Sequence, residues 1–217
     1  MYKERHSFRL ITDGAIQIDQ VRSFRYLGTI VNGNNTLAEE IRERIIKGNK
    51  AFHANRTLFK SNFVSRKSKL KLYWSVIRPF VVYGCETWVF NESIIQRLSV
   101  FEWKILRKIF GPNKEDNGNW RIKTNKELDE SIKHRNIINY VKAQRLSWVG
   151  HTNRMPETSI VKKIYKLKPL TRRPVGTPKS RWEDDVRNDL KKMKLIKWAD
   201  QVQDRLKWKL TVEKPRF

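Results

Sequence analysis

The chain has 217 residues, enough for one large domain or two small ones with a sizeable core. Its 47 Lys and Arg residues outnumber 22 Asp and Glu residues, so the formal net charge is +25. Both halves share the excess, since residues 1–110 contain 20 basic and 9 acidic side chains. Cations spread in this way predict a long polyanion, RNA or DNA, as the partner and argue against a small-molecule substrate.

The composition also excludes other classes of protein. No apolar run is long enough to span a membrane and the first residues lack a signal-peptide pattern, so we expect no membrane partner. Cys85 is the only cysteine, which excludes an intramolecular disulfide and favours an intracellular location. The four histidines are scattered without zinc-ligand spacing, and we expect no cofactor in this chain.

The β-strand signals lie in the first 33 residues. The segments FRLIT and AIQID flank an Asp-Gly pair, which predicts a hairpin, and residues 21–31 are expected to form a third strand. In such a strand Phe24, Tyr26, Gly28 and Ile30 share one face. A glycine inside a strand marks a bulge or the close approach of another backbone, such as that of a nucleic acid, and both interpretations stay open here.

After these strands the apolar residues take a helical period. Thr36 and Glu39 form a capping-box pattern that opens a helix to about Lys60. Ser65 opens a second helix, in which Pro79 predicts a kink or a stop one residue earlier. The segment VVYGCETW is expected to form a buried turn before the next helix.

Four further helices and a polar loop are predicted beyond this turn. Asn91 is expected to cap a helix that Gly111 and the following proline end, and residues 113–123 form a polar loop that is the best domain boundary. A capping box at Thr124 opens a long helix to about Trp148, a short helix covers 157–166, and a last one runs from about Arg181 to Lys194.

The predicted fold is therefore mainly α. A short N-terminal antiparallel β-hairpin or meander over 1–33 precedes a helical bundle over 34–112 and a basic helical C-terminal region over 113–217. No catalytic or metal-binding residue is expected in it. Asp184 and Asp185 are adjacent carboxylates that can hold Mg²⁺ in other contexts, but their place in a first helical turn favours a helix-dipole role. The neighbours of Cys85 are apolar and aromatic, which predicts a buried thiol.

One segment is unusually basic. Between Ile160 and Trp182 the chain has eight basic residues and no acidic one. Three prolines keep part of this segment out of regular helix, so successive cations can follow a phosphate chain; the alternative is an ordinary solvated face. The candidate phosphate contacts are Lys162, Lys163, Arg172, Arg173, Lys179 and Arg181.

The segment QRLSWVGHTNRM, residues 144–155, has two interpretations. In one, Gly150 ends a helix and Trp148 packs in the core. In the other, Arg145, His151 and Arg154 share a surface that faces an anion. Both stay open from the sequence.

Six stretches in order resemble one family: FRYLGTIV, EIRERIIKGNKAFHA, LYWSVIRPFVVYGCETW, LSVFEWKILRKIFG, RLSWVGHTNRM and VGTPKSRWEDDV. They resemble the C-terminal part of the endonuclease–reverse transcriptase of non-LTR (LINE-type) retrotransposons, over residues 16–192. Each stretch alone is a weak signal, and their shared order makes the resemblance more specific.

The resemblance implies a role for each part of the chain. In that family the YLG segment ends the polymerase palm and forms the primer grip, so Phe24, Tyr26, Leu27 and Gly28 are implied to contact or support the primer. The helical bundle is implied to be the thumb on the template–primer duplex. The basic C-terminal region is implied to bind RNA or target DNA during target-primed reverse transcription, in the nucleus.

The chain departs from the family in two ways. The family's fingers, its palm with the aspartates that bind Mg²⁺, and its endonuclease precede the YLG segment and have no counterpart here. We therefore expect a fragment that is not an enzyme by itself, with Mg²⁺ only in the missing palm. Where relatives read Gly-Arg-Pro, this chain has Gly176-Thr177-Pro178, and a threonine cannot make the charge-assisted phosphate contact of an arginine.

The alternative is a free-standing DNA-binding protein with a helix-turn-helix near residues 124–166. Such a motif needs a recognition helix with exposed side chains that read bases. The segment RNIINYVKAQRLSW has crowded apolar residues and is a poor candidate for that helix.

Overall fold

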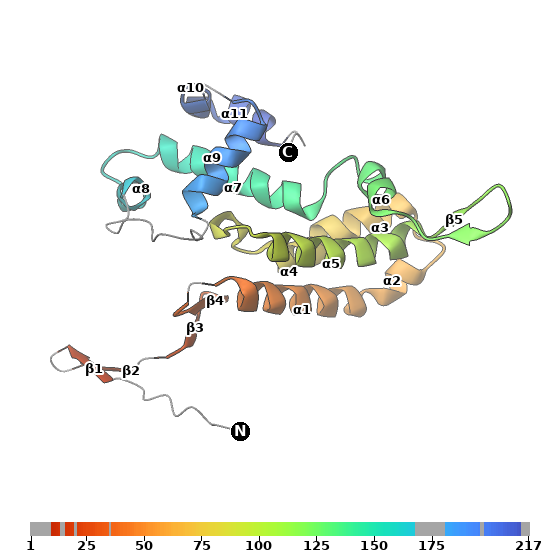
Figure 1. Cartoon of the computed structure of the whole chain (residues 1–217), viewed down its shortest axis with the longest axis horizontal. Coiled ribbons are helices and arrows are strands. Elements are labelled where there is room, and N and C mark those ends of the chain that lie inside the picture. The colour runs from red at the N-terminus through yellow and green to blue at the C-terminus, as the bar shows by residue number, and fades with distance from the viewer. Residues whose placement is uncertain are drawn as a thin grey trace.

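The computed structural model describes residues 21–34, 36–167, 181–195 and 198–213 with their side chains, and the backbone of 10–13 and 16–19. Figure 1 shows helices stacked in layers, with α1 on one side, α3, α4 and α5 next, then α6 and α7, which α9 crosses, and α10 and α11 outermost. Short two-stranded sheets lie at the N-terminal end and beside α6. The mainly α fold is confirmed.

Two successive hairpins replace the predicted hairpin and third strand. Strands β1 (Leu10–Asp13) and β2 (Ile16–Asp19) pair antiparallel, as predicted. Strands β3 (Ser23–Tyr26) and β4 (Thr29–Asn32) form a second hairpin, so the single strand expected over 21–31 was wrong.

The second hairpin reverses at Leu27 and Gly28, which have φ angles of 46° and 81°. A two-residue turn with positive φ at both positions matches the right-handed twist of the strands. The reversal places Phe24 opposite Val31, rather than on one face with Ile30. Gly28 is thus a turn residue and not a gap in a strand.

The first helices follow the predicted ranges, but one cap differs. Helix α1 (Ala38–Ala54) is followed after Asn55 by α2 (Arg56–Lys60). No side chain caps α1, so the capping box at Thr36 was wrong. The Thr36 backbone N–H instead donates to Asn32 Oδ1 at 2.9 Å, which ties the end of β4 to the start of the helix.

The next helical run passes Pro79 without stopping. Helix α3 (Arg66–Leu72) begins at the predicted Ser65 cap, continues as a π-helical turn over Tyr73–Ile77, and ends as α4 (Arg78–Val82). The π turn ends at Ile77, two residues before Pro79, whose missing N–H removes a helical hydrogen bond. Of the two predicted outcomes, a kink or a stop, the stop was wrong, because the helical run continues as α4.

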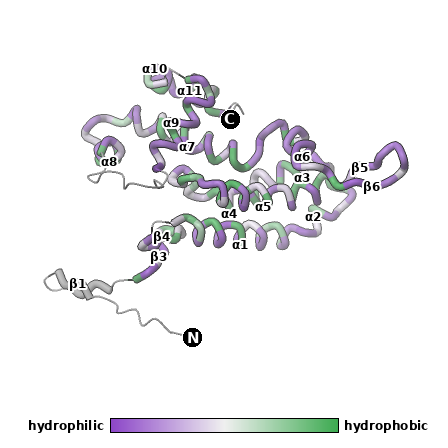
Figure 2. Tube along the Cα trace, viewed as in Figure 1, coloured by the Kyte–Doolittle hydropathy of each residue, from purple (hydrophilic) through white to green (hydrophobic). Residues whose placement is uncertain are grey.

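The predicted buried turn and third helix are confirmed. A 3₁₀ turn over Cys85–Thr87 leads to α5 (Glu92–Phe110). Asn91 caps the N-terminus of this helix, because its side chain accepts a hydrogen bond from Ile94 N at 2.9 Å. Figure 2 shows hydrophobic and hydrophilic residues interspersed along α1 and α5, the pattern of amphipathic helices. Their apolar faces pack together. Gly48 of α1 also lets Val81 of α4 approach within 2.4 Å of where a Cβ on Gly48 would stand.

The long helix predicted from Thr124 to Trp148 is two helices. The capping box at Thr124 is confirmed, but α6 (Asn125–Ser131) ends before Lys133 and His134, which have positive φ. Helix α7 (Ile137–Arg154) then begins anew. A small hairpin of β5 (Asn113–Lys114) and β6 (Trp120–Arg121) precedes α6.

The C-terminal region adds a second core. Helices α8 (Ile160–Lys166) and α9 (Trp182–Lys192) agree with the predicted ranges. Helices α10 (Trp198–Gln203) and α11 (Arg205–Val212) were not predicted. The second half of α7 packs against these helices, while Leu128, Ile132, Ile137 and Val141 belong to the first core. The division of the chain at residue 113 stays a prediction.

The first core contains one buried acid. Glu102 accepts from Tyr73 Oη at 2.8 Å and from Ile137 N at 2.7 Å, so it joins α3–α4, α5 and the start of α7. Burial raises the pKa of Glu102 from 4.5 to about 7, although both hydrogen bonds act in the opposite direction. The folded chain therefore keeps a proton that the unfolded chain has lost between these two pH values.

We predict that this proton makes stability fall as pH rises. Below the pKa that Glu102 has in the unfolded chain, the contribution of the bound proton to the free energy of unfolding is fully present. About 3 kcal/mol of that free energy is lost between pH 4.5 and 7. Glu102→Gln is expected to remove this slope in urea unfolding at pH 5 and pH 7.5, whereas Glu92→Gln, at an exposed helix end, is expected to keep it. Equal slopes in wild type and Glu102→Gln would contradict the prediction.

Candidate nucleic-acid interface

The β3–β4 hairpin is attached to the helical bundle at its turn. Arg44 Nη2 donates to Gly28 O at 2.9 Å, and Tyr83 Oη donates to Leu27 O at 3.2 Å. Glu40 accepts from Ile30 N at 2.7 Å and forms a buried ion pair with Arg44 at 2.5 Å. The turn carbonyls and one strand amide are therefore satisfied by the bundle, which fixes the position of the hairpin.

The same hairpin exposes the side chains that the sequence singled out. Phe24 is 60% exposed, Tyr26 61% and Leu27 74%. Nothing approaches a Cβ on Gly28 more closely than Tyr83 Cε1, at 4.0 Å. The predicted primer-grip residues thus lie together on one fixed, largely apolar surface. Their contact with a primer stays a prediction.

A basic groove between α1 and α5 was missed by the sequence analysis. It has a volume of about 680 Å³ and a floor that includes Ile45 and Phe101. Arg42 lies on its α1 side, and Arg97 and Lys104 lie on its α5 side. The signal was present in the sequence as polar residues at helical spacing, but only the packing of the two helices shows that they face one groove.

Arg145 does not lie on the expected surface. Its side chain is 1% exposed and forms an ion pair with Asp185 at 2.9 Å and another with Asp189. Arg145 Nη1 also donates to Trp88 O at 3.1 Å. The expectation that Arg145 faces an anionic ligand was wrong, because two carboxylates of α9 hold it in the interior. Asp185 therefore has a buried ion-pair partner, Arg145, in addition to the helix-dipole role predicted for it.

His151 and Arg154 do lie near each other, in a hollow between α7 and α11 that also includes Trp148. Helix α7 continues through Gly150 to Arg154, so a helix end at Gly150 was also wrong. Gly150 instead makes room for Trp208, whose Nε1 lies 2.2 Å from where a Cβ would stand. Trp148 is 37% exposed and is not a core residue.

The residues of the basic segment have different environments. Lys162 Nζ donates to Asn153 O at 3.0 Å and Met155 O at 2.7 Å, so it binds carbonyls at the end of α7 and not a surface phosphate. The expectation for Lys162 was therefore wrong. Lys163 is exposed, and Arg181 is half-buried at the start of α9. The remaining candidates lie outside the described residues: Arg172, Arg173 and Lys179.

Other kinds of site find no support in the part of the chain that the structure describes. Cys85 is buried, as predicted, and burial raises the pKa of its thiol to about 12. Within the described ranges, no group of three or more His, Cys, Asp or Glu residues is arranged to hold a metal ion. No described helix is long and apolar enough to cross a membrane.

The chain is similar to a transposon-derived protein. It is 25% identical over 198 residues to an uncharacterized transposon-derived protein of Caenorhabditis elegans, over 88% of this chain and 70% of the relative. No model of a known protein family matches the chain, and no solved structure matches it. The similarity points to a transposon origin for this chain.

We predict that Gly28 is required for the shape of the turn. A β-branched residue at φ 81° is strained, so Gly28→Val is expected to cost about 1–2 kcal/mol, while Gly28→Asn costs less. Gly33→Val is the matched control, since a Cβ there meets nothing closer than Arg22 O at 4.0 Å and that glycine has no positive φ. Hydrogen exchange of the Ile30 amide and urea unfolding measure the effect, and equal values for the valine and asparagine variants at position 28 would contradict it.

Proposed function

We propose that the chain is the thumb and C-terminal part of a non-LTR retrotransposon reverse transcriptase. It grips the template–primer during target-primed reverse transcription and leaves nucleotide addition to a palm outside these residues. The relation to a transposon-derived protein and the ordered resemblance of six stretches support this proposal.

The observation that carries the proposal is that one helix, α1, both holds the hairpin and lines a basic groove. Glu40 and Arg44 hold the hairpin, and Arg42, which lies on another face of α1, lines the α1–α5 groove. A duplex whose backbone lies along this groove is contacted by cations of two helices, while the recessed primer end reaches the exposed Phe24 and Tyr26.

The helix-turn-helix alternative fits the geometry less well. Helices α6 and α7 are joined by a short turn, but α7 does not present its first turn to solvent. Ile137 is fully buried and its N–H donates to Glu102. A recognition helix contacts base edges with its N-terminal residues, and here Ile137 lies in the core while Ile138 and Asn139 are half-buried.

The proposal predicts a preference for a recessed primer–template over a blunt duplex. In mobility shifts, Phe24→Ala with Tyr26→Ala is expected to weaken primer–template binding about tenfold and to leave blunt-duplex binding unchanged, because stacking at the recessed end is lost. Equal affinity of the wild-type chain for both substrates, or primer extension by this chain with Mg²⁺, would contradict the proposal.

Loss of the groove cations is expected to weaken binding to all sequences alike. Replacing Arg42, Arg97 and Lys104 with Gln should lower the salt slope by about 2 to 3 for a duplex. The matched control replaces three exposed lysines of α2 and α3 (Lys60, Lys67 and Lys71) with Gln and is expected to keep the slope. A sequence-selective loss would favour the helix-turn-helix alternative.

A further inference from the structure

A second groove lies on the far side of the bundle from α1, between α7 and α11. It has a volume of about 720 Å³, within the range of pockets that hold ligands. Trp148, His151 and Arg154 of α7 line one side, and Arg205 and Lys209 of α11 line the other. The sequence analysis offered His151 and Arg154 as part of an anion-facing surface, but it assigned no binding role to Trp148 or to the residues of α11.

Trp148 gives this groove a stacking surface. The residue is 37% exposed, and the centre of the His151 ring lies 5.5 Å from that of the indole, with the two planes tilted by 43°. Trp208, by contrast, is buried, and its indole N–H donates to Leu146 O at 3.0 Å. Trp148 instead combines a partly open ring with a histidine neighbour at the edge of a basic hollow.

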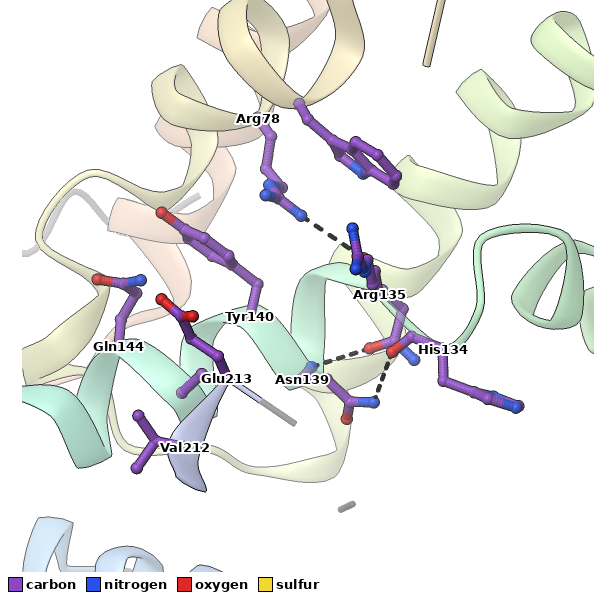
Figure 3. A pocket seen from close by; sticks show the side chains of 11 residues that line it. Arg78, His134, Arg135, Asn139, Tyr140, Gln144, Val212 and Glu213 are labelled. Atoms are coloured by element: carbon purple, nitrogen blue, oxygen red, sulfur yellow. Dashed lines mark hydrogen bonds between the residues drawn. The ribbon is translucent and has the colours of Figure 1, made fainter. Parts of the chain in front are cut away.

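A smaller hollow of about 370 Å³ adjoins the groove and lengthens it. The two share Ala143, Gln144, Val212 and Glu213 as lining residues. In Figure 3 the labelled Arg78, Arg135 and Tyr140 surround this hollow. The Arg78 guanidinium carbon lies 4.0 Å from the centre of the Tyr140 ring, so a second aromatic residue and a cation are already stacked there.

The combined surface is positively charged. Five cations and two carboxylates line it, a net charge of +3 with the histidines neutral. The carboxylates are Glu86 and Glu213, and Glu213 is within 3.9 Å of Lys209. The cations are Arg78, Arg135, Arg154, Arg205 and Lys209.

We propose that this surface binds a single-stranded nucleic-acid segment, with an unpaired base stacked on Trp148 and its phosphates on Arg205 and Lys209. Bases inside a duplex are stacked on both faces by their neighbours, so only an unpaired base can offer a face to Trp148. Stacking of this kind does not depend on sequence. The inference rests on the proposed function and adds to it a path for the single strand that leaves the duplex.

The test measures fluorescence anisotropy of labelled oligothymidylate of about 12 nucleotides with the full chain. Trp148→Leu is expected to raise Kd about tenfold, and Trp148→Tyr, which keeps a ring, by less than about threefold. Arg205→Gln with Lys209→Gln should lower the salt slope by about 1.4. The matched control, Lys71→Gln with Lys207→Gln, removes two exposed lysines outside the groove and is expected to keep the wild-type values.

A primer–template with an overhang of about two nucleotides separates this inference from the proposed function. The groove variants are expected to bind it as the wild type does, because it offers little single strand to the groove. Unchanged oligothymidylate binding in both Trp148→Leu and the Arg205/Lys209 pair would overturn the inference while primer–template binding still supports the thumb. If circular dichroism shows that the Trp148→Leu variant is unfolded, the variant with both Arg205→Gln and Lys209→Gln decides the result.

Discussion

The buried guanidinium of Arg145 is the contact on which the C-terminal half of the structure depends. It joins α7 to Asp185 and Asp189 of α9 and to the Trp88 carbonyl before α5. Removing one partner from a buried ion pair typically costs 3–5 kcal/mol, because the remaining charge stays without compensation. Val186 and Leu190 of α9 share a core with Trp208 of α11, which packs on α7 at Gly150. The groove with Trp148 lies beside this core, between α7 and α11.

Local signals predicted much of the fold. The caps at Ser65, Asn91 and Thr124 are each a side chain that binds a backbone amide three residues on, so the sequence alone contains both partners. The break between α6 and α7 at Lys133 and His134 was not predicted, because it contains neither glycine nor proline. The turn at Leu27 was predicted to be part of a strand, because its neighbours are β-formers. Tertiary contacts decide these positions: Tyr83 and Arg44 bind the turn, and Glu102 fixes the start of α7.

The candidate site was predictable in kind but not residue by residue. In a chain with a net charge of +25, any arginine is a plausible phosphate contact, and nothing in the residue type separates Arg145 or Lys162 from the exposed cations. Arg145 is distinguished by Asp185 and Asp189, which lie 40 and 44 positions away in the sequence. The grooves could not be predicted from the sequence for the same reason, since Arg42 and Arg97 line one groove only after α1 has packed on α5.

The positions of four carboxylates explain how so basic a chain can fold and still keep cationic grooves for the polyanion that we propose as its partner. Glu40, Glu102, Asp185 and Asp189 are used where elements meet: at the hairpin, between α5 and α7, and between α7 and α9. Among the described lining residues, the α1–α5 groove has no acid, and the α7–α11 groove with its adjoining hollow has two, Glu86 and Glu213. The cations on these surfaces repel one another, and the phosphate backbone that we propose as their ligand would relieve this repulsion and release its own counterions.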